Sequence, residues 1–461
     1  MTRPADDLKG RRVLVVGLAR SGMSAARFLL DRGAEVTVND QRGAAELGGE
    51  ARTLESLGAA VVLDGHPESI FRSAEMVVVS PGVPLALPVF AAARAGGAEI
   101  LSEIELAARY LEGTIVAITG SNGKSTTTAL AGDMLRAGGL RARTCGNIGI
   151  PFIEMADEDG PDAFYALEVS SFQLEAIQRF RPKVAVLTHI TPDHLDRYAD
   201  YAAYVGAKAR IFEAQTSDDH AVLNDRDGDS RSLRPRLRAQ VHLFSTERPV
   251  ENGGYLENGR LVLARGGRVE TLAEAAELPI PGSHNIENVL AAAIACREAG
   301  VPVEAIRAAA LAFRALPHRL EKVDEIGGVA FYNDSKATNV DAAMKALASF
   351  PGRRVWIVLG GKDKGGDFAS LIPLLRERAA AVLTIGQAAA TIEQQIAGSR
   401  PVIRAGRLEQ AVRDAARLAG AEGGVVLLAP GCASFDQYRN YEERGEHFRS
   451  IVRALREEAH A

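Results

Sequence analysis

The sequence predicts an α/β protein built around parallel β-sheets. Short runs of β-branched residues, such as RVLVVGL, MVVVSPG, IVAITG, VAVLTHI and VWIVLGG, alternate with stretches rich in alanine and leucine. Strands that are apolar on both faces and are each followed by a helix are typical of parallel sheets covered by helices on both sides. Because the alternation continues through most of the chain, the prediction applies to the whole protein.

Length and charge narrow the possible classes of protein. A chain of 461 residues exceeds one ordinary core, so we expect about two to four domains. The net charge of −5 gives no general positive field for nucleic acid or anionic lipid. No apolar stretch reaches the length of about 18 residues that a membrane span needs. We therefore expect a soluble, cytoplasmic protein, whose three scattered cysteines are free thiols and not part of a disulfide or zinc framework.

Three domains are expected, with borders at residues 1–104, 105–316 and 317–461. The first and third read as Rossmann-like strand–helix series, and the second opens on the strand and loop GTIVAITGSNGKSTT. Between about 240 and 271, glycine and asparagine turns separate short alternating strands, beginning with VHLFS. This pattern predicts a small antiparallel sheet of hairpins on a central domain that is otherwise parallel.

A phosphate-binding loop is the strongest single motif. In AITGSNGKSTT an apolar strand turns through Gly120 and Gly123 into a helix that begins near Lys124. Backbone N–H groups of such a turn, together with the helix N-terminus, bind phosphate oxygens, while Lys124 offers charge and Ser125 a hydroxyl to magnesium. The spacing is shorter than in GxxxxGK[ST], and a plain strand-to-helix turn is the alternative. We expect ATP binding, although such a loop alone does not define a reaction.

Three further polar residues follow strands expected at the same sheet edge. Glu168 ends an apolar run, as acids that bind magnesium beside a phosphate loop do, but it could instead cap the helix that begins at SSFQLE. His194 lies in an acidic loop after the next strand, where a solvated histidine is the alternative. Lys208 lies on a predicted helix, where an exposed lysine is the simpler interpretation. Only their combination favours a joint catalytic role.

The amino-terminal segment resembles a dinucleotide-binding fingerprint. VLVVGLARSGMSAARFLLDRGAEVTVND reads as strand, glycine turn, helix and strand, ending at the acid Asp40. Ala19 stands where the second glycine of GxGxxG lets a backbone approach a pyrophosphate. The additional methyl group makes NAD a poorer fit and disfavours an NAD-dependent oxidoreductase.

A series of motifs carries a more specific resemblance. GSNGKSTT, EVSSFQLE, DHLDRY, GAKARIF, GSHNIENVLAA, LPHRLE, YNDSKATN, LGGKDKGGDF and APGCASFDQYRNYEERG occur in this order over nearly the whole chain. Together they resemble the Mur ligase family, and SSFQLE and GCASFDQ point to the member that adds D-glutamate. The resemblance implies an ATP-driven enzyme that joins D-glutamate to UDP-N-acetylmuramoyl-L-alanine through an acyl phosphate, releasing ADP and phosphate.

The resemblance also assigns the cofactor site. It implies two magnesium ions: Glu168 binds one and His194 the other, together with a carbamylated Lys208, while Ser125 offers its hydroxyl. Carbamylation converts an amine into an oxygen ligand that suits a hard metal, and it is a hypothesis here. Asn285 and Asn288 face the adenine, although Asn285 could instead cap a helix; Arg319 reaches the phosphates and Asp334 the ribose. The expected ATP loop comprises Gly120, Ser121, Asn122, Gly123, Lys124, Ser125 and Thr126.

The substrate sites follow from the same resemblance. In the first domain, Ser21 and Gly22 are expected near the diphosphate and Asp40 and Arg42 near the uracil, with simple helix capping as the alternative for Ser21. Ser80 and Asn147 are expected as further contacts to the UDP substrate, with helix capping or a turn as the alternative for Ser80. For D-glutamate, Thr338 and Lys364 are expected at one carboxylate and Ser434 and Tyr441 near the other, while Lys364 could instead be an exposed loop lysine. Lys336 is also expected in the substrate site. The family often has phenylalanine where Tyr441 stands, which puts that side-chain contact in doubt. Ser434 could also begin a helix.

Two other functions are compatible with part of these motifs. A folate-glutamylating ligase of the same superfamily is disfavoured by the UDP-type first domain and by SSFQLE. A regulatory P-loop ATPase without a small-molecule product would share the phosphate loop, but that function does not explain the later motifs. For the ligase we expect small-molecule substrates only, with no nucleic acid and no membrane insertion, and a monomer.

Overall fold

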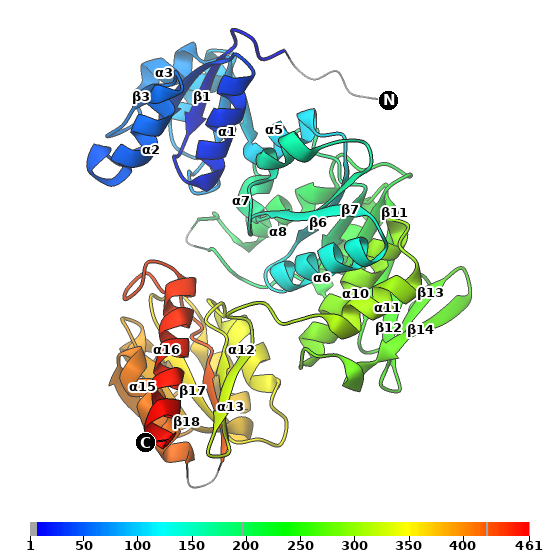
Figure 1. The fold of residues 1–461 in the computed structure, drawn as a ribbon, viewed down its shortest axis with the longest axis vertical. Helices are drawn as coiled ribbons and strands as arrows, with labels where there is room; N and C mark the ends of the chain where they lie inside the picture. The colour runs from blue at the N-terminus through cyan, green and yellow to red at the C-terminus, as the bar shows by residue number, and fades with distance from the viewer. Residues whose placement is uncertain (1–6, 196, 421–422, 461) are drawn as a thin grey trace. The chain divides into compact units, whose positions relative to one another are not determined.

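The computed structural model describes residues 7–195, 197–420 and 423–460 and confirms the α/β class (Figure 1). Three sheets occupy this part of the chain, in the same order as the three predicted domains. The chain divides into two compact units. One comprises the described residues up to 190, with 200–277 and 287–311; the other comprises 191–195, 197–199, 278–286 and the described residues from 312. The borders 1–104, 105–316 and 317–461 stay predictions, and residues 1–6 and 461 lie outside the described ranges.

The first sheet is parallel throughout, with its described strands in the order β3-β2-β1-β4-β5. Its strands are β1 (Arg12–Val16), β2 (Glu35–Asn39), β3 (Ala60–Val62), β4 (Met76–Val79) and β5 (Glu99–Ser102). Its helices are α1 (Arg20–Asp31), α2 (Ala44–Ser56), α3 (Glu68–Ser73), α4 (Val89–Ala95) and α5 (Glu103–Tyr110). The strand order reverses direction between β1 and β4. In open α/β sheets, this switch point is where ligands bind, beyond the carboxyl ends of the strands.

The central sheet is mixed and runs, in the described residues, in the order β14-β13-β12-β11-β10-β9-β6-β8-β7. Its strands are β6 (Thr114–Thr119), β7 (Arg141–Gly146), β8 (Ala163–Glu168), β9 (Val184–Leu187), β10 (His220–Asn224), β11 (Gln240–Ser245), β12 (Gly253–Glu257), β13 (Arg260–Arg265) and β14 (Arg268–Glu274). Its connecting helices are α6 (Lys124–Ala137), η1 (Phe152–Glu158), α7 (Ser171–Leu174), α8 (Tyr201–Ala209), η2 (Arg210–Phe212), α9 (Gly228–Leu233), η3 (Arg234–Arg236), η4 (Ala275–Glu277), α10 (Ser283–Glu298) and α11 (Val303–Ala312).

The antiparallel part of the central sheet differs in one respect from the prediction. The hairpins β12–β13 and β13–β14 are antiparallel as expected. The segment VHLFS, however, belongs to β11, which pairs in parallel with both β10 and β12. The hairpins therefore extend one continuous mixed sheet. Glycine and asparagine turns identify hairpins locally, whereas the direction of β11 depends on a pairing with β10 that no local pattern encodes.

The third sheet, described from residue 321 onward, has the order β15-β16-β20-β17-β18-β19. Its strands are β15 (Glu321–Ile326), β16 (Val329–Asn333), β17 (Val355–Gly360), β18 (Ala379–Ile385), β19 (Val402–Gly406) and β20 (Gly424–Leu428). Only β15 runs antiparallel to its neighbour among these described pairs. Two apolar clusters, one on each face, pack the sheet against its helices. These helices are α12 (Val340–Ala348), η5 (Phe368–Leu371), α13 (Ile372–Arg378), α14 (Ala389–Gln395), α15 (Leu408–Ala419) and α16 (Tyr441–His460).

Two whole-chain expectations can be compared with the structure. Cys145, Cys296 and Cys432 are all buried free thiols. Burial raises the pKa of the Cys432 thiol to about 12, so this group stays protonated at neutral pH. Among the described helices, none combines the length and apolar character needed to cross a bilayer.

Candidate active site

The phosphate loop lies between β6 and α6, and its two glycines adopt backbone angles that favour glycine. Gly120 has φ +147° and Gly123 has φ +83°. A Cβ on Gly120 would come within 1.9 Å of Thr188 Oγ1, and one on Gly123 within 2.4 Å of Asn288 Oδ1. Both glycines are therefore required by the surrounding packing as well as by the turn. The interpretation as a simple glycine-rich turn does not account for this close enclosure.

Lys124 is the first residue of α6 and folds back over the loop. Its Nζ donates hydrogen bonds to the carbonyl oxygens of Gly120 and Ser121, both at 2.9 Å. The loop is tied to the neighbouring strand by Thr188, whose hydroxyl donates to the Asn122 carbonyl at 2.6 Å. The ammonium group is thus held where the loop and the N-terminus of α6 meet. Anions bind favourably at such a position.

The remaining loop residues lie in the same buried environment. Ser121 donates its N–H to the His189 carbonyl at 2.8 Å, and its hydroxyl lies 2.9 Å from the Tyr204 hydroxyl. Ser125 and Thr126 occupy the first turn of α6 and are 2% and 8% exposed. Their roles in phosphate and metal binding stay predictions. Ser125 is buried beside the loop, which is where a hydroxyl could reach a metal ion held against phosphate.

Glu168 ends β8, next to the strand that carries the loop. In the sheet it is the register partner of Ile118, two residues before Gly120. The Glu168 carboxylate is buried and accepts a hydrogen bond from Asn147 Nδ2 at 2.7 Å. The alternative role as a helix cap is wrong, because Ser170 caps α7 in a capping box with Gln173. Asn147, predicted as a substrate contact, thus also orients the candidate metal ligand.

Lys208 is not the exposed helix lysine that its sequence context suggested as the alternative. It lies on α8, is 2% exposed, and donates from Nζ to the Gly120 carbonyl at 2.8 Å. The same ammonium lies 4.7 Å from the centre of the Tyr204 ring. Three of the four predicted metal-site residues, Ser125, Glu168 and Lys208, therefore lie beside the phosphate loop.

His194 belongs to the other compact unit, so the joint metal site stays a prediction. Its backbone has φ +56°, an unusual conformation for a residue other than glycine. Its N–H donates to Asp193 Oδ1 at 2.9 Å, and its side chain is 36% exposed.

Asp193, next to His194, is a residue that the sequence reading did not single out. It accepts from Asn339 Nδ2 at 3.0 Å and from Lys364 Nζ at 3.1 Å. Burial alone would raise the pKa of Asp193, but Lys364, His194 and Asn339 together lower it. The carboxylate therefore stays ionised and links the DHLDRY loop to the loop that carries Lys364.

The two asparagines of α10 have different environments. Asn288 accepts a hydrogen bond from the Thr127 hydroxyl at 3.2 Å, on the helix that follows the phosphate loop. Asn285 donates from Nδ2 to the Pro281 carbonyl at 2.6 Å and is the third residue of α10. It is not the residue that caps this helix. Neither observation tests the predicted contact with adenine.

Arg319 and Asp334 lie at a strained turn that opens the third domain. The residues on either side of Arg319, His318 and Leu320, have φ values of +61° and +45°. Asp334 accepts the Leu320 N–H at 3.2 Å and so holds this turn. Removal from water raises the pKa of Asp334 to about 6, although Arg319 and the Leu320 N–H act in the opposite direction. Two predicted ATP contacts are thus brought together, and the carboxylate is destabilised in its charged form.

Several predicted D-glutamate residues of the third domain lie on segments that one buried arginine, Arg444, joins by hydrogen bonds. Lys336 Nζ lies 3.7 Å from the centre of the Tyr441 ring, Thr338 is half-buried and Ser434 is buried. Arg444, which the sequence reading missed, is 1% exposed and donates to the Ser335 carbonyl at 2.8 Å and the Cys432 carbonyl at 3.2 Å. Burial lowers the pKa of Arg444 to about 10.

Through these hydrogen bonds Arg444 joins the segment around Lys336 to the segment around Ser434. The alternative that Ser434 begins a helix is wrong, because the next described helix, α16, begins at Tyr441.

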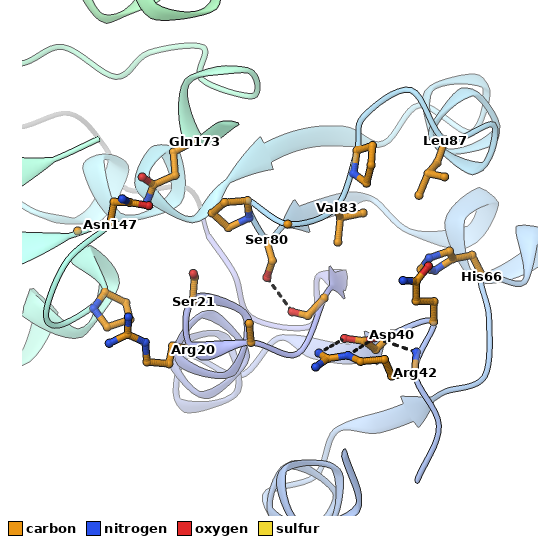
Figure 2. A pocket seen from close by; sticks show the side chains of 18 residues that line it. Arg20, Ser21, Asp40, Arg42, His66, Ser80, Val83, Leu87, Asn147 and Gln173 are labelled. Carbon is orange, nitrogen blue, oxygen red and sulfur yellow. Dashed lines mark hydrogen bonds and ion pairs between the residues drawn. The ribbon is translucent and has the colours of Figure 1, made fainter. Parts of the chain in front are cut away.

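A cavity of about 400 Å³ lies at the switch point of the first sheet (Figure 2). Its lining includes most of the predicted UDP-substrate residues: Ser21, Asp40, Arg42, Ser80 and Asn147. Figure 2 shows Asp40, Arg42 and His66 toward one end and Asn147 and Gln173 toward the other. Gly22 supports the glycine turn from within α1, since a Cβ there would come within 1.9 Å of the Gly17 carbonyl oxygen.

Asp40 and Arg42 form a rigid pair at one end of this cavity. Arg42 Nε lies 3.0 Å from Asp40 Oδ1 and Arg42 Nη2 lies 2.8 Å from Oδ2, a bidentate geometry. The backbone N–H of Leu18 also donates to Asp40 at 2.8 Å. Burial would raise the pKa of Asp40, but these donors lower it to about 2. The Ser80 hydroxyl donates to the Gly17 carbonyl at 2.7 Å and so fixes the turn that forms the cavity wall.

His66 is a lining residue that sequence reasoning missed. Asn39 Nδ2 donates to the carbonyl oxygens of Val62 and Gly65, which leaves Asn39 Oδ1 as an acceptor 2.6 Å from His66 Nδ1. His66 therefore carries a proton on Nδ1, and in the neutral ring Nε2 is the acceptor. A histidine after the glycine of LDGHPE gives no signal by itself, because the loop reaches the cavity only in the folded domain.

The fold and the arrangement of the loop residues indicate the class of enzyme. The glycine loop follows a strand, β6, that pairs in parallel with both of its neighbours. Such a loop, with a lysine at the start of the following helix and a buried carboxylate on the neighbouring strand, is typical of nucleotide-dependent phosphoryl-transfer enzymes. Three family descriptions match successive segments: Mur ligase MurD-like, N-terminal domain at residues 11–102; Mur ligase middle domain at 118–296; and Mur ligase, glutamate ligase domain at 318–432. The chain belongs to the Mur ligase family, whose members use ATP. The family prediction is confirmed.

Several curated relatives are similar along their full lengths. The UDP-N-acetylmuramoylalanine--D-glutamate ligase of Acidobacterium capsulatum is 49% identical over 98% of both chains. The proteins of the same name from Koribacter versatilis and Geobacter metallireducens are each 46% identical, over 98% and 97% of this chain and 99% and 98% of their own.

Solved structures with low sequence identity share the fold. A pseudomurein peptide ligase type C from Methanothermus fervidus has a TM-score of 0.61 at 20% identity, covering 96% of this chain and 100% of its own. MurF from Acinetobacter baumannii has a TM-score of 0.59 at 16% identity, covering 99% and 92%. The folylpolyglutamate synthase of Mycobacterium tuberculosis, solved with ADP and AMPPCP, has a TM-score of 0.57 at 18% identity, covering 76% and 92%. These likenesses support the three-domain fold alone.

Proposed function

We propose that this protein is an ATP-dependent ligase that joins D-glutamate to UDP-N-acetylmuramoyl-L-alanine during the synthesis of peptidoglycan precursors. The observation that carries the proposal is the 49% identity to a ligase of that name over 98% of both chains. Similarity over the whole length means that the UDP-type first domain, the ATP loop and the glutamate ligase domain occur together. The proposed reaction needs all three.

The chemistry is activation of a carboxylate. The terminal carboxylate of the alanyl group attacks the γ-phosphorus of ATP, forming an acyl phosphate and releasing ADP. The amine of D-glutamate then attacks the acyl carbon, and the tetrahedral intermediate expels phosphate as the amide forms. The attacking amine gives up its proton in this step. Phosphoryl transfer depends mainly on positioning and on offsetting negative charge, and we assign these tasks to Lys124 and Arg319.

The residues beside the loop fit a divalent cation. Glu168 offers a buried carboxylate and Ser125 a hydroxyl, and oxygen ligands of this kind suit Mg²⁺. We propose that Glu168 and Ser125 hold one ion and that His194 and Lys208 hold a second. Bound magnesium would offset charge on the transferring phosphoryl group.

For Lys208 we propose a carbamate, formed when its neutral amine adds carbon dioxide and releases a proton. The product carries oxygen atoms and a negative charge where the unmodified side chain carries an ammonium group. Lys208 Nζ lies 2.8 Å from the Gly120 carbonyl oxygen, and this position supports a role for Lys208 at the phosphate loop.

The substrate sites are assigned to the first and third domains. We propose that the 400 Å³ cavity holds the UDP group, with Asp40 and Arg42 at the uracil and Ser21 and Gly22 at the diphosphate. Lys336, Thr338, Lys364, Ser434 and Tyr441 are proposed to surround D-glutamate, and Asn285, Asn288 and Asp334 to contact the adenosine. Three domains with the predicted borders, a monomer and a cytoplasmic location complete the proposal.

A dinucleotide-dependent oxidoreductase is the rival from another class. Ala19 keeps its methyl group in the wall of the cavity, where the fingerprint has a glycine. That observation disfavours NAD, and full-length similarity to D-glutamate ligases disfavours both this rival and a purely regulatory ATPase.

A phosphate-release assay tests the proposal. We expect phosphate release only when ATP, magnesium, UDP-N-acetylmuramoyl-L-alanine and D-glutamate are all present, with L-glutamate and a panel of other amino acids inactive. Mass spectrometry of the product should show one added glutamyl group. Phosphate release without the muramoyl substrate, or equal rates with a different amino acid, would contradict the assignment.

A further inference from the structure

Three side chains of the central domain converge at a place that the proposed reaction does not use. His220 is the first residue of β10, His242 is the third residue of β11, and Glu298 is the last residue of α10. The strands pair with His220 opposite Gln240 and Val222 opposite His242, so the two histidines point to the same face of the sheet. His220 and His242 are 8% and 5% exposed, and the Glu298 side chain is 1% exposed.

The spacing of their ligand atoms suits a single metal ion. His220 Nδ1 lies 3.0 Å from His242 Nε2 and 3.7 Å from Glu298 Oε2. One ligand atom from each of the three residues lies within 4.8 Å of the other two. Ligand atoms about 2 Å from a tetrahedral zinc ion are separated by about 3.3 Å. Rotations of the side chains within their wells would close the remaining differences.

The histidines are in the chemical state that metal binding requires. Burial lowers the pKa of His242 to about 4 and lowers that of His220, in spite of the nearby Glu298 carboxylate. Both rings are therefore neutral at pH 7, and each has a nitrogen lone pair. His242 Nδ1 is buried and has no hydrogen-bond partner among the described residues, because Glu298 Oε1 is 3.7 Å away. The hydrogen bonds among the described residues thus leave His242 Nδ1 unsatisfied.

Positive groups near the cluster limit which ions it can hold. Arg297 Nη2 lies 3.2 Å from Glu298 Oε1, and Arg265 Nη1 lies 3.4 Å from Oε2. Both guanidinium groups repel a metal ion bound at Glu298. The Arg265 side chain, however, is 59% exposed and can turn into solvent. Two imidazoles and one carboxylate favour zinc and similar transition metals over magnesium or calcium. The ligand set therefore selects for ion type even though the surrounding charge weakens binding.

We propose that His220, His242 and Glu298 form a binding site for Zn²⁺ or a similar divalent transition-metal ion, separate from the phosphate loop. The ion would join β10, β11 and the end of α10, with solvent as the fourth ligand. The proton now shared between the facing ring nitrogens would move to the other nitrogen of one ring, so both rings stay neutral. If that ring is His242, the proton moves to Nδ1, which faces Glu298. The role assigned to the ion is to stabilise the central domain.

Cobalt spectroscopy on the full-length protein tests the site. Co²⁺ would be added in the presence of excess Mg²⁺, which occupies sites made of oxygen ligands. We expect the strong visible absorption of a tetrahedral cobalt site, its loss when one equivalent of Zn²⁺ is added, and a higher thermal unfolding midpoint with Zn²⁺ than with a chelator. A wild-type protein without this absorption and without a zinc-dependent midpoint would overturn the proposal.

Matched variants locate the bound ion. His220→Gln, His242→Gln and Glu298→Gln should each lose the cobalt absorption and the zinc-dependent midpoint, whereas His447→Gln, at a half-buried histidine outside the central sheet, should keep both. Because one variant could fail to fold, each would first be compared with the wild type by circular dichroism in chelator. Retention of the absorption by the folded members of the three cluster variants would assign the ion elsewhere and overturn the proposal.

Discussion

Lys208 donates a hydrogen bond from Nζ to the carbonyl oxygen of Gly120, the first glycine of the phosphate loop, at 2.8 Å. A lysine from α8 thus contacts the loop across 88 residues of sequence. Lys208 is 2% exposed, and its ammonium group lies 4.7 Å from the centre of the Tyr204 ring. A chemical change at this nitrogen would alter both the charge and the hydrogen bonding of the loop.

The carbamate hypothesis predicts a dependence on carbon dioxide. Protein labelled with ¹³C-bicarbonate should show a carbamate resonance that is missing from Lys208→Ala, and turnover in carbon dioxide-free buffer should fall and recover on adding bicarbonate. We expect Lys208→Ala to lose about 100-fold in turnover, as for loss of a metal-supporting ligand. Lys183→Ala, at a lysine with 41% side-chain exposure in the same unit, should behave as wild type. A fully active protein without the labelled resonance would rule out the modification.

Lys124→Ala should abolish turnover and leave the fold intact. The side chain contributes two hydrogen bonds to loop carbonyls and little packing, so we expect a loss of stability of about 1 kcal/mol. The charge that it brings to the phosphates has no substitute within the loop. Phosphate release and circular dichroism would be measured together, with the exposed Lys322→Ala as the control. Normal turnover in a folded Lys124→Ala protein would show that the loop assignment is wrong.

Gly123→Ala should destabilise the central domain more than a comparable glycine substitution does. Alanine at φ +83° costs about 1–2 kcal/mol for the backbone alone, and its Cβ would meet Asn288 Oδ1. Gly139 has a similar φ of +79° but has open space around it, so Gly139→Ala isolates the backbone cost. The difference between their unfolding midpoints measures the clash, for which we expect about 1–3 kcal/mol. Adding Asn288→Ala to Gly123→Ala should recover part of it; equal effects at both glycines would refute the packing argument.

Lys364→Ala should chiefly raise the KM for D-glutamate. Lys364 Nζ lies 3.1 Å from Asp193 Oδ1, so its ammonium group is held in place before any amino acid binds. We expect the KM for D-glutamate to rise at least about tenfold, the effect of losing about 1.4 kcal/mol of binding, while the KM for ATP stays the same. The exposed Lys362→Ala, two residues earlier, is the matched control. An unchanged KM for D-glutamate would remove Lys364 from the substrate site.

The phosphate loop could be predicted because its constraints are local. Gly120, Gly123 and Lys124 adopt the turn and helix start that their residue types favour, and the flanking apolar strand is visible in the sequence. The direction of β11 could not be predicted, because parallel and antiparallel strands can share one residue pattern and only the pairing with β10 decides. A local sequence pattern therefore predicts a strand or helix and its ends better than it predicts which strands pair with each other.

Burial of charged side chains was the main information missing from the sequence. Lys208 and Arg444 both occur in helices, where lysine and arginine are usually exposed. Their acceptors are main-chain carbonyls, Gly120 for Lys208 and Ser335 and Cys432 for Arg444, far away in sequence. Because every residue has a main-chain carbonyl, the sequence does not show which one accepts a hydrogen bond. A carboxylate partner, in contrast, would be visible as an aspartate or glutamate. The contact between Asn147 and the Glu168 carboxylate was not anticipated for a different reason: the two residues are 21 positions apart and meet only when β7 and β8 pair in the folded domain.

The stability of the third domain should depend on pH through Asp334. Its pKa is raised from the ordinary 3.8 to about 6, so the folded domain binds an extra proton between these values. This group therefore lowers stability as the pH rises from about 4 to 6, and above pH 6 the folded domain carries the full cost of an ionised, desolvated carboxylate. Asp334→Asn removes that charge and keeps an oxygen acceptor for the Leu320 N–H.

At pH 8 we expect Asp334→Asn to unfold about 2–4 °C above the wild type, the shift that about 1 kcal/mol produces in a domain of this size. At pH 4 the two midpoints should coincide, because Asp334 is then protonated. Turnover should fall nevertheless, since the carboxylate is the proposed ribose contact, and the loss should appear as a higher KM for ATP. Asp367→Asn, at an exposed position, should change neither quantity. If the midpoint difference is the same at pH 4 and pH 8, the native fold does not destabilise the ionised carboxylate of Asp334.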